Sequence, residues 1–464
     1  MTSRFICVHG HFYQPPREDP LTREIPVESG ASPFPNWNER IYAECYRPNA
    51  ELGNFGRISF NIGPTLCEWM ASTHPDTLNA IISQDRENMR LHGVGNAMAQ
   101  PYHHSILPLA SYRDKVTQVS WGIADFEHRF GRKPQGMWLP ETAVDLETLC
   151  VLTDHGIEYT ILAPWQAEAE NLDDTQPYRV DLPGGRHMTV FFYHAGVSSG
   201  VSFNPDLTVN ADHFASRELA RQFPPAGTRR KGPRLMLIAS DGELYGHHQP
   251  LRDHFLQHLL NHASEPAGLK PTFPALWLKS NPPKRTVRIR ENTSWSCHHG
   301  VERWRGKCEC TPGDGQWKYR LREAFNRLAA SLDDIYAREA GAFTPDVWKF
   351  RDAYIAVLLG QRNPEDLIWE QAGRRLDAEQ TARLRKLLEA QYERQRMFAS
   401  CAWFFEDFDR IEPRNAVAYA TQAARLTCQA TGVDLSEQLV KNLSKVTSSR
   451  TALKGDTVFR RYWR

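Results

Sequence analysis

The sequence lacks any apolar stretch close to the roughly 20 residues that a membrane-spanning helix needs. It also lacks an excess of one charge, because 56 Lys and Arg residues stand against 55 Asp and Glu residues, a formal net charge of +1. Such a balance creates no long-range field that would attract nucleic acid or an anionic membrane. The first residues contain no apolar segment typical of a signal peptide. We therefore expect a cytoplasmic protein with neither a nucleic-acid nor a membrane partner.

A disulfide framework and a nucleotide-binding loop are also missing. The nine cysteines are odd in number and scattered, which indicates a reduced protein. No glycine-rich phosphate loop of the G-x-x-x-x-G-K-[ST] type occurs. Cys297, Cys308 and Cys310 have the spacing C-x10-C-x-C, which is not a usual zinc signature. We interpret their segment as a loop bordering the site and expect neither a metal nor an organic cofactor.

Short apolar runs alternate with amphipathic helical patterns over the first part of the chain. This alternation predicts βαβ units and a parallel sheet, and its length suits a closed or nearly closed β/α barrel. The region from Gln316 onward is mostly helical and rich in apolar faces. We expect a catalytic barrel over residues 1–310 and a helical domain over residues 311–464 that contributes to the substrate cleft. The predicted strands are Phe5–Val8, Arg57–Ile62, Gly136–Leu139, Tyr159–Leu162, Thr189–Tyr193 and Arg234–Ala239, and the predicted helices are Thr65–Arg90, Ser111–Phe130, Leu146–His155, Ala211–Gln222 and Pro250–Ala263.

Polar and aromatic residues gather just after several of these strands, where β/α barrels carry their chemistry. His9 and His11 follow the first strand together with Gln14, and Glu141 follows a strand that contains Trp138. The 13 Trp residues often stand beside polar residues, a mixture that suits the apolar faces and hydroxyl rims of sugars. Core packing is the common alternative for any one of them.

Two carboxylates are the candidate catalytic pair. Asp241 ends a strand apolar enough to be buried on both faces, so burial and a neighbouring acid should raise its pKa. A raised pKa suits a general acid near neutral pH, and Glu243 competes for that role. In a pair formed with Glu141, one carboxylate would attack the anomeric carbon of a sugar while the other protonates the leaving oxygen. A residue at a helix N-terminus, stabilised by the helix dipole, is an equally good reading of Glu141 from its own segment.

The order and spacing of these motifs resemble glycoside hydrolase family 57, which includes α-amylases, 4-α-glucanotransferases and α-glucan-branching enzymes. The resemblance implies a (β/α)7 barrel, a retaining mechanism, an oligo- or polysaccharide substrate and no required metal. It places the nucleophile on Glu141, the acid/base on Asp241, and His11 and Trp295 in substrate subsites. The matching segments are His9–Pro15, a second motif that ends in His104–Pro108, Trp138–Glu141, Asp241–His247, the stretch from Ser294-Trp295 to Trp304, and Cys401–Asp407 with Trp403.

Two departures from the family pattern bear on substrate choice. Phe12 and Tyr13 separate His11 from Gln14, and Asn96 stands where the family usually has Glu. The aromatic run that begins at Trp403 is interpreted as part of a cleft wall, with interdomain packing as the alternative.

Two other functions compete with a glycosidase. A metal-dependent polysaccharide deacetylase would use Asp241, His247 and His248 as cation ligands. A catalytically inert glycan-binding protein would be expected to lose one of the two carboxylates, and this sequence has both. The sequence leaves hydrolysis and transfer undistinguished and indicates no oligomeric state.

Overall fold

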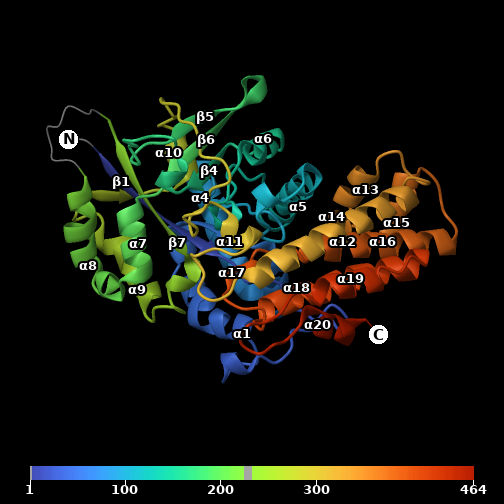
Figure 1. The fold of residues 1–464 in the computed structure, drawn as a ribbon. Helices are drawn as coiled ribbons and strands as arrows, with labels where there is room; N and C mark the ends of the chain where they lie inside the picture. The colour runs from blue at the N-terminus through green and yellow to red at the C-terminus, as the bar shows by residue number, and fades with distance from the viewer. Residues whose placement is uncertain (1–2, 224–231, 464) are drawn as a thin grey trace. The chain divides into compact units, whose positions relative to one another are not determined.

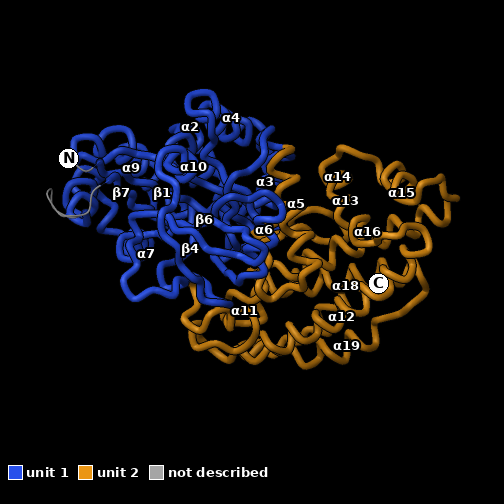
Figure 2. The backbone as a smooth tube through the Cα atoms, turned by 90° about the horizontal axis from the view of Figure 1, so that it is seen from above, with its two compact units in different colours: residues 1–14, 27–100, 129–295 blue, residues 15–26, 101–128, 296–464 orange. Residues whose placement is uncertain are grey.

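The computed structural model of the protein describes residues 3–223 and 232–463, which form two compact units (Figure 2). Unit 1 comprises residues 1–14, 27–100 and 129–295, and unit 2 comprises residues 15–26, 101–128 and 296–464. This division differs from the contiguous segments 1–310 and 311–464, because unit 2 takes in two stretches from the first part of the chain. A contribution of the helical region to a substrate cleft stays a prediction.

Unit 1 is built around parallel strands. The central strand β1 has β2 on one side and β7 on the other, and β2 pairs with β3. Strand β4 pairs in parallel with β6, and β5 adds to β6 as an antiparallel strand. The strands are β1 (Arg4–Phe12), β2 (Ser59–Ile62), β3 (Ala97–Met98), β4 (Tyr159–Leu162), β5 (Tyr178–Asp181), β6 (His187–Phe192), β7 (Arg234–Asp241) and β8 (Leu269–Pro271).

Residues outside the regular strands close this sheet into a barrel. Parallel bridges from Ala99 to Met137 and from Gly136 to Tyr159 connect β3 to β4. At the other edge, the backbone N–H of His194 after β6 donates to the carbonyl of Leu237 in β7 at 2.7 Å. The circuit therefore runs through β1, β2, β3, the 136–137 segment, β4, β6 and β7, which confirms the predicted (β/α)7-type barrel.

Helices connect and surround the strands of unit 1 (Figure 1). The predicted single helix Thr65–Arg90 is two helices, α3 and α4, because Pro75 disfavours helical geometry at His74, which has φ −136° and ψ 55°. Helix α4 ends at His92, and Gly93 after it has a φ of 69°, a left-handed conformation that glycine adopts without steric strain. The helices of unit 1 are α1 (Trp37–Ile41), α2 (Arg47–Glu51), α3 (Pro64–Thr73), α4 (Pro75–His92), α6 (Leu146–Asp154), α7 (Ala195–Phe203), α8 (Ala211–His213), α9 (Arg252–His258) and α10 (Pro274–Leu278).

Unit 2 is helical. Its long helices α12, α16 and α18 run side by side (Figure 1), and the predicted barrel helix Ser111–Phe130 corresponds to α5, which lies almost entirely in this unit. The helices of unit 2 are α5 (Tyr112–Phe130), α11 (Glu302–Arg305), α12 (Gln316–Ala340), α13 (Val347–Ala353), α14 (Ile355–Leu358), α15 (Pro364–Ala372), α16 (Ala378–Arg396), α17 (Cys401–Phe404), α18 (Ile411–Thr431), α19 (Ser436–Leu443) and α20 (Gly455–Tyr462).

Each unit has its own apolar core. In unit 1 the strand residues Cys7, Ile161, Phe191 and Leu237 pack with Trp138 in the barrel interior. In unit 2 aromatic and Leu side chains from α5, α12, α13, α15 and α16 pack together.

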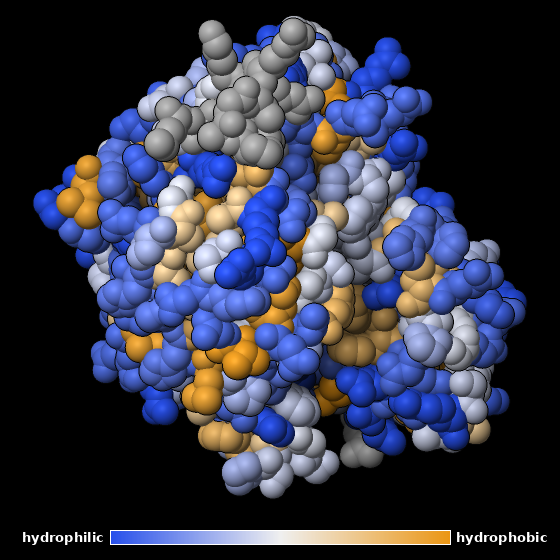
Figure 3. Space-filling view, turned by 90° about the vertical axis from the view of Figure 1, so that its left-hand side faces the viewer, coloured by the Kyte–Doolittle hydropathy of each residue, from blue (hydrophilic) through white to orange (hydrophobic). Residues whose placement is uncertain are grey.

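On the face drawn in Figure 3, hydrophilic residues predominate and hydrophobic ones appear in small groups. No helix in the described part of the chain is both long and apolar enough to cross a bilayer.

Candidate active site

The candidate site is a row of polar side chains at the carboxyl ends of neighbouring barrel strands. His11 in β1 is opposite Asp241 in β7 on one side and opposite Asn61 in β2 on the other. Residues opposite each other in parallel strands direct their side chains to the same face. His11 indeed contacts Asn61 at 2.9 Å between Nδ1 and Nδ2. The strand pairing therefore brings Asp241 and the two histidines of the first motif to one face.

Glu141 lies in a strained turn just after the 136–137 segment. Its φ is 57° and that of Thr142 is 49°, so two consecutive residues with side chains adopt the left-handed region. Helix α6 begins only at Leu146, and Asp145 caps it by accepting from the backbone N–H of Thr148. Glu141 is thus not a helix N-terminal residue. Backbone strain of this kind persists where the surroundings hold it and is concentrated at functional sites.

Trp295 fixes the Glu141 carboxylate. The indole Nε1–H of Trp295 donates to Glu141 Oε2 at 2.9 Å, and its backbone N–H donates to the Glu141 carbonyl at 3.0 Å. The same indole lies edge-on to Trp138, with ring centroids 5.1 Å apart. Glu141 is half-buried, so one side chain both orients its carboxylate and covers it with apolar surface.

Gln166 stabilises this turn through hydrogen bonds to Thr142. This fully buried residue accepts from the Thr142 hydroxyl at 2.9 Å and donates to the Thr142 carbonyl at 2.8 Å. Its Oε1 also accepts from the backbone N–H of Ala163 at 2.8 Å, at the end of β4. The residue after Glu141 is therefore tied to the neighbouring strand end by three hydrogen bonds.

Asp241 has the electrostatics of a general acid. Desolvation among the strand ends, followed by the negative charges of Glu243 and Glu141, raises the pKa of Asp241 to about 8. The side chain is also exposed, so a substrate can reach the carboxyl from solvent. A carboxyl that is protonated near neutral pH and open to solvent can donate a proton to a bound substrate.

Glu243, the competing acid, is buried and already engaged. Its Oε1 accepts from the Tyr46 hydroxyl at 2.7 Å and from the backbone N–H of Tyr13 at 2.9 Å. Burial raises the pKa of Glu243 to about 7, and the bonds from Tyr46 and Tyr13 oppose that rise. Gln14 joins the same network by donating to the Tyr46 hydroxyl at 3.1 Å. This network favours Asp241 over Glu243 as the acid, and it commits Gln14 to Tyr46.

His9 and His11 are neutral. Burial, with a smaller contribution from His11, lowers the pKa of His9 to about 3, and burial lowers the pKa of His11 to about 4. Both imidazoles stack on Trp138, with centroids 4.5 and 5.3 Å away. His9 is fully buried and engages both ring nitrogens within the protein, Nδ1 with the Ser59 hydroxyl at 2.9 Å and Nε2 with Asn61 at 3.2 Å, so its predicted contact with substrate is replaced by a structural one. A neutral imidazole both donates and accepts, so His11 can bind a sugar hydroxyl without a competing charge.

An aromatic row continues beyond Trp295. Tyr193 lies edge-on to both Trp295 and Trp165, and Trp165, which is 44% exposed, donates from Nε1 to the Ser294 carbonyl. Sequence reasoning missed Trp165, Tyr193, Gln166 and Asn61. All four lie at or just after barrel strand ends, so the rule that found Glu141 and Asp241 could have found them too.

Three predicted substrate residues belong to unit 2. His104 is buried and bonds through Nδ1 to the Ser400 hydroxyl at 2.6 Å, and Trp304 is fully buried. Trp403 is also fully buried, under the Arg322 guanidinium 3.6 Å from its ring centroid and beside Phe398. Trp403 is thus a core residue of unit 2, which contradicts its interpretation as a cleft wall.

His247 does not form a metal site with Asp241. Its Nδ1 bonds to Glu44, and its ring lies edge-on to Trp37. Among the residues that the structure describes, the only group with the ligands for a metal ion involves neither His247 nor His248. The deacetylase alternative therefore has no ligand set at this strand end.

The two departures from the family pattern have structural explanations. Asn96 is buried and donates to the carbonyls of Phe55 and Ile58, a task for an amide that an ionised Glu cannot perform. Phe12 is buried beside Gly10 and Gly242, where an added Cβ would approach its ring to 2.7 and 2.4 Å. The inserted aromatic residue is accommodated because both neighbours lack a side chain.

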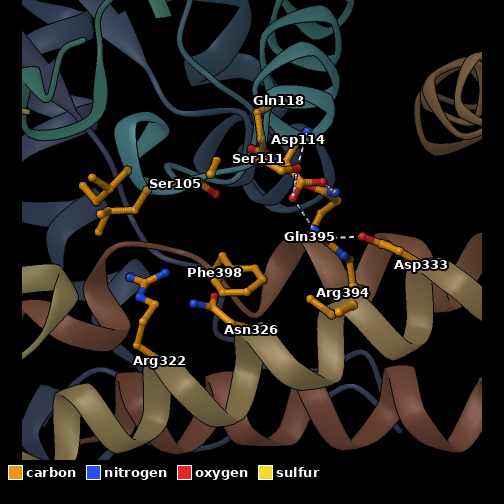
Figure 4. A pocket seen from close by; sticks show the side chains of 15 residues that line it. Ser105, Ser111, Asp114, Gln118, Arg322, Asn326, Asp333, Arg394, Gln395 and Phe398 are labelled. Atoms are coloured by element: carbon orange, nitrogen blue, oxygen red, sulfur yellow. Dashed lines mark hydrogen bonds and ion pairs between the residues drawn. The ribbon is translucent and has the colours of Figure 1, made fainter. Parts of the chain in front are cut away.

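Unit 2 contains a separate polar cavity of about 310 Å³ (Figure 4). Three of the charged residues in its wall pair with one another, since Arg394 contacts Asp114 at 2.8 Å and Asp333 at 2.7 Å. Gln395 donates to Asp114 at 2.6 Å. The cavity thus holds a structural ion network and contains neither member of the candidate catalytic pair.

The profile of glycosyl hydrolase family 57 matches residues 8–283, more than half of the chain and nearly the whole barrel. The chain belongs to this family. A domain of unknown function, DUF3536, matches residues 314–464. The family assignment made from the motifs is confirmed.

Individual relatives are distant and matched only in part. The chain is 24% identical to an α-amylase of Pyrococcus abyssi over 39% of its own length and 28% of that protein. It is 26% identical to a 4-α-glucanotransferase of Thermococcus litoralis over 33% of its length and 23% of that protein. The chain therefore spans about a quarter of the curated relatives that it matches.

Solved structures support the fold over the whole chain. An exo-type maltose-forming amylase from Pyrococcus sp. ST04 superposes with a TM-score of 0.77 at 15% identity, over 99% of this chain and 88% of that one. A family 57 branching enzyme from Pyrococcus horikoshii gives a TM-score of 0.65 at 15% identity, over 99% and 97% of the two chains.

Proposed function

We propose that this protein is a retaining enzyme that cleaves or transfers α-glucosidic linkages in oligo- or polysaccharides. Glu141 is the nucleophile and Asp241 the acid/base. The observation that carries the proposal is the pairing of a half-buried Glu, held in a strained turn by Trp295, with an Asp whose pKa is raised partly by that Glu.

In the first step a Glu141 oxygen attacks the anomeric carbon while the bond to the leaving oxygen breaks, and Asp241 gives that oxygen its proton. The product is a glycosyl ester of Glu141. In the second step the Asp241 carboxylate takes a proton from water or a sugar hydroxyl, whose oxygen attacks the same carbon and releases Glu141. Two inversions retain the anomeric configuration.

The binding groups follow from the same geometry. The neutral imidazole of His11 supplies a donor or an acceptor for a hydroxyl group, and the exposed ring of Trp165 supplies an apolar face for a sugar. The names of the relatives include an amylase, a glucanotransferase and a branching enzyme, which supports an α-glucan as substrate class.

Replacing Glu141 by Ala tests the covalent mechanism. On an aryl α-maltoside the Glu141→Ala variant should lose several orders of magnitude in rate, because the ester can no longer form. Added azide should restore part of this rate and yield a glycosyl azide of inverted configuration. Glu147→Ala, an exposed acid in the first turn of α6, is the matched control and should keep wild-type rates.

Near-wild-type activity of Glu141→Ala would contradict the proposal. If the proposal holds, resolving the products of maltooligosaccharides by length and anomer distinguishes hydrolysis from transfer. Products shorter than the substrate indicate water as the acceptor, and longer products indicate a sugar.

A further inference from the structure

Four potential metal ligands meet in unit 2, outside the candidate active site. They are Cys297, His299, Cys308 and Cys310, and their ligand atoms all lie within 4.8 Å of one another. Cys297 and Cys308 are buried, whereas His299 is exposed, so the group lies at the surface and can be reached by an ion from solvent. The proposed glycosidase chemistry uses none of these side chains.

Three of the six distances among the ligand atoms are close to those of tetrahedral coordination, and all six are within 4.8 Å. The sulfurs of Cys297 and Cys308 are 3.5 Å apart, and His299 Nδ1 is 3.3 Å from the Cys308 sulfur and 3.5 Å from the Cys310 sulfur. Zinc bonds of about 2.3 Å to sulfur and about 2.0 Å to nitrogen place tetrahedral ligands about 3.5 to 3.8 Å apart. The four atoms therefore lie close enough together for small movements of the side chains to place all of them on one zinc ion.

A disulfide does not account for this arrangement. The distance of 3.5 Å between the Cys297 and Cys308 sulfurs is far longer than a disulfide bond of about 2.05 Å, and both cysteines are free. A disulfide between any two of the three cysteines would also leave the third thiol and the imidazole directed at the same point. A shared cation explains all four side chains together.

Two short turns present the ligands in pairs. Cys297 and His299 flank one residue, and the Gly300 N–H closes their turn on the Cys297 carbonyl at 3.2 Å. Cys308 and Cys310 also flank one residue, and the Thr311 N–H closes that turn on the Cys308 carbonyl at 3.1 Å. Helix α11 separates the two turns. The arrangement is built from repeated backbone geometry and not from a chance contact of side chains.

Positive groups border the cluster. Three thiolates around Zn²⁺ carry a net charge of −1, which a neighbouring cation stabilises. Lys318 is buried and donates to the Thr311 hydroxyl at 3.2 Å, and Arg303 donates to the Cys310 carbonyl at 2.8 Å. Both side chains are thus held beside the second turn.

We propose that Cys297, His299, Cys308 and Cys310 bind a structural zinc ion. Four protein ligands fill a tetrahedral shell and leave no position for a substrate, so the ion ties the two turns together and performs no chemistry. Cys297 follows Trp295 by two residues, and Trp295 orients Glu141. The proposal goes beyond the glycosidase function and departs from the expectation of a metal-free protein.

Metal content of the full-length protein tests this inference. Wild-type protein, purified under reducing conditions and freed of loosely bound ions, should contain about one zinc ion per chain by elemental analysis. The Cys308→Ser variant should lose most of it. Cys150→Ser, a half-buried cysteine on α6 in unit 1, is the matched control and should retain a full complement.

Substitution with cobalt reports on the ligands even if Cys308→Ser folds poorly. Wild-type protein loaded with Co²⁺ should show the visible bands of tetrahedral Co²⁺ and thiolate-to-cobalt charge transfer, and His299→Ala should shift them. Wild-type protein that holds no zinc as isolated and takes up neither ion after reduction would overturn the proposal. So would zinc content equal in wild type and Cys308→Ser. Neither measurement involves a glucan, so its result is independent of the Glu141 test.

Discussion

Asp241 carries the clearest pH prediction at the scale of a single residue. The carboxyl must be protonated to act as an acid, so the rate on natural glucans should fall as pH rises through about 8, the pKa of Asp241 in the folded protein. Asp241→Asn should abolish this fall and most of the rate. An aryl glycoside, whose leaving group needs little protonation, should lose much less. Equal losses on both substrates would move the acid role to Glu243.

The same shift has a consequence for stability with a definite sign. An unfolded Asp has a pKa of about 3.9, so between about pH 4 and 8 the folded protein binds a proton that the unfolded chain does not. Folding stability therefore falls with rising pH over this window. The gain in melting temperature of Asp241→Asn over wild type should grow from pH 5 to pH 8, and a constant difference would show that the shift is absent.

The position of a residue was predictable where a strand end fixes it, and was misjudged where burial decides. Glu141 and Asp241 lie at strand ends that apolar runs reveal, and the strand register brings Asp241 beside His11. The aromatic run at Trp403 is followed by acidic residues, which suggested a cleft wall, yet the Trp403 ring is buried under Arg322. The sequence of that segment contains no sign of the helix that covers it.

At the scale of elements, the turn after the 136–137 segment depends on a contact with the next strand. Gln166 joins Thr142 to the end of β4, and that bond network holds Glu141 in its left-handed conformation. Gln166→Ala should let the turn relax and misplace Glu141, the proposed nucleophile. We expect kcat to fall by roughly 10- to 100-fold with little change in KM, since displacements of about 1 Å carry costs of that order.

A matched variant separates positioning from stability. Gln84→Ala also removes a side-chain amide that binds two backbone groups of unit 1, the Gly56 N–H and the Ala50 carbonyl. It should lower the melting temperature without a loss of kcat at moderate temperature. If both variants reduce kcat in proportion to their loss of stability, Gln166 has no positioning role.

At the scale of elements, strands that are buried apolar runs were predictable from the sequence, and strands without such a run were not. The predicted strands correspond to β1, β2, β4, β6, β7 and the 136–137 segment, because each is an apolar run buried in the barrel. Strand β3 has two residues and β5 alternates buried and exposed positions at an edge, so neither produces a continuous apolar signal. The cysteines of the four-ligand cluster were noted in the sequence, but their C-x10-C-x-C spacing is not a usual zinc signature, so no metal was expected. Folding brings the C-x-H and C-x-C pairs together across a short helix.

At the scale of the whole chain, the division into units does not follow the order of the sequence. Helix α5 stands between barrel strands in the chain but packs with the helical unit through Trp121, in a cluster that also holds Tyr102 from the segment before the helix. Its amphipathic pattern is the same as that of a barrel helix, so periodicity alone assigns it to the barrel. Buried charges are what distinguish it, since Asp114 near its start pairs with Arg394 of α16.

That buried ion network predicts how unit 2 responds to acid. Burial alone would raise the pKa of Asp114, but the charges of Arg394 and Arg351 outweigh burial and lower it to about 2. The ionised form therefore stabilises the fold above the unfolded pKa of about 3.9, and this contribution is lost as pH falls toward 2.

Asp114→Asn should cost roughly 3–5 kcal/mol at pH 7, because two arginines lose a buried partner. The cost should shrink steadily below about pH 4. Denaturant unfolding of the two proteins from pH 7 to pH 2 measures both quantities. The exposed Asp334→Asn on α12 is the control and should stay within about 0.5 kcal/mol of wild type throughout. A cost for Asp114→Asn that is independent of pH would mean that the Asp114 charge contributes nothing, and that shape alone holds α5 in place.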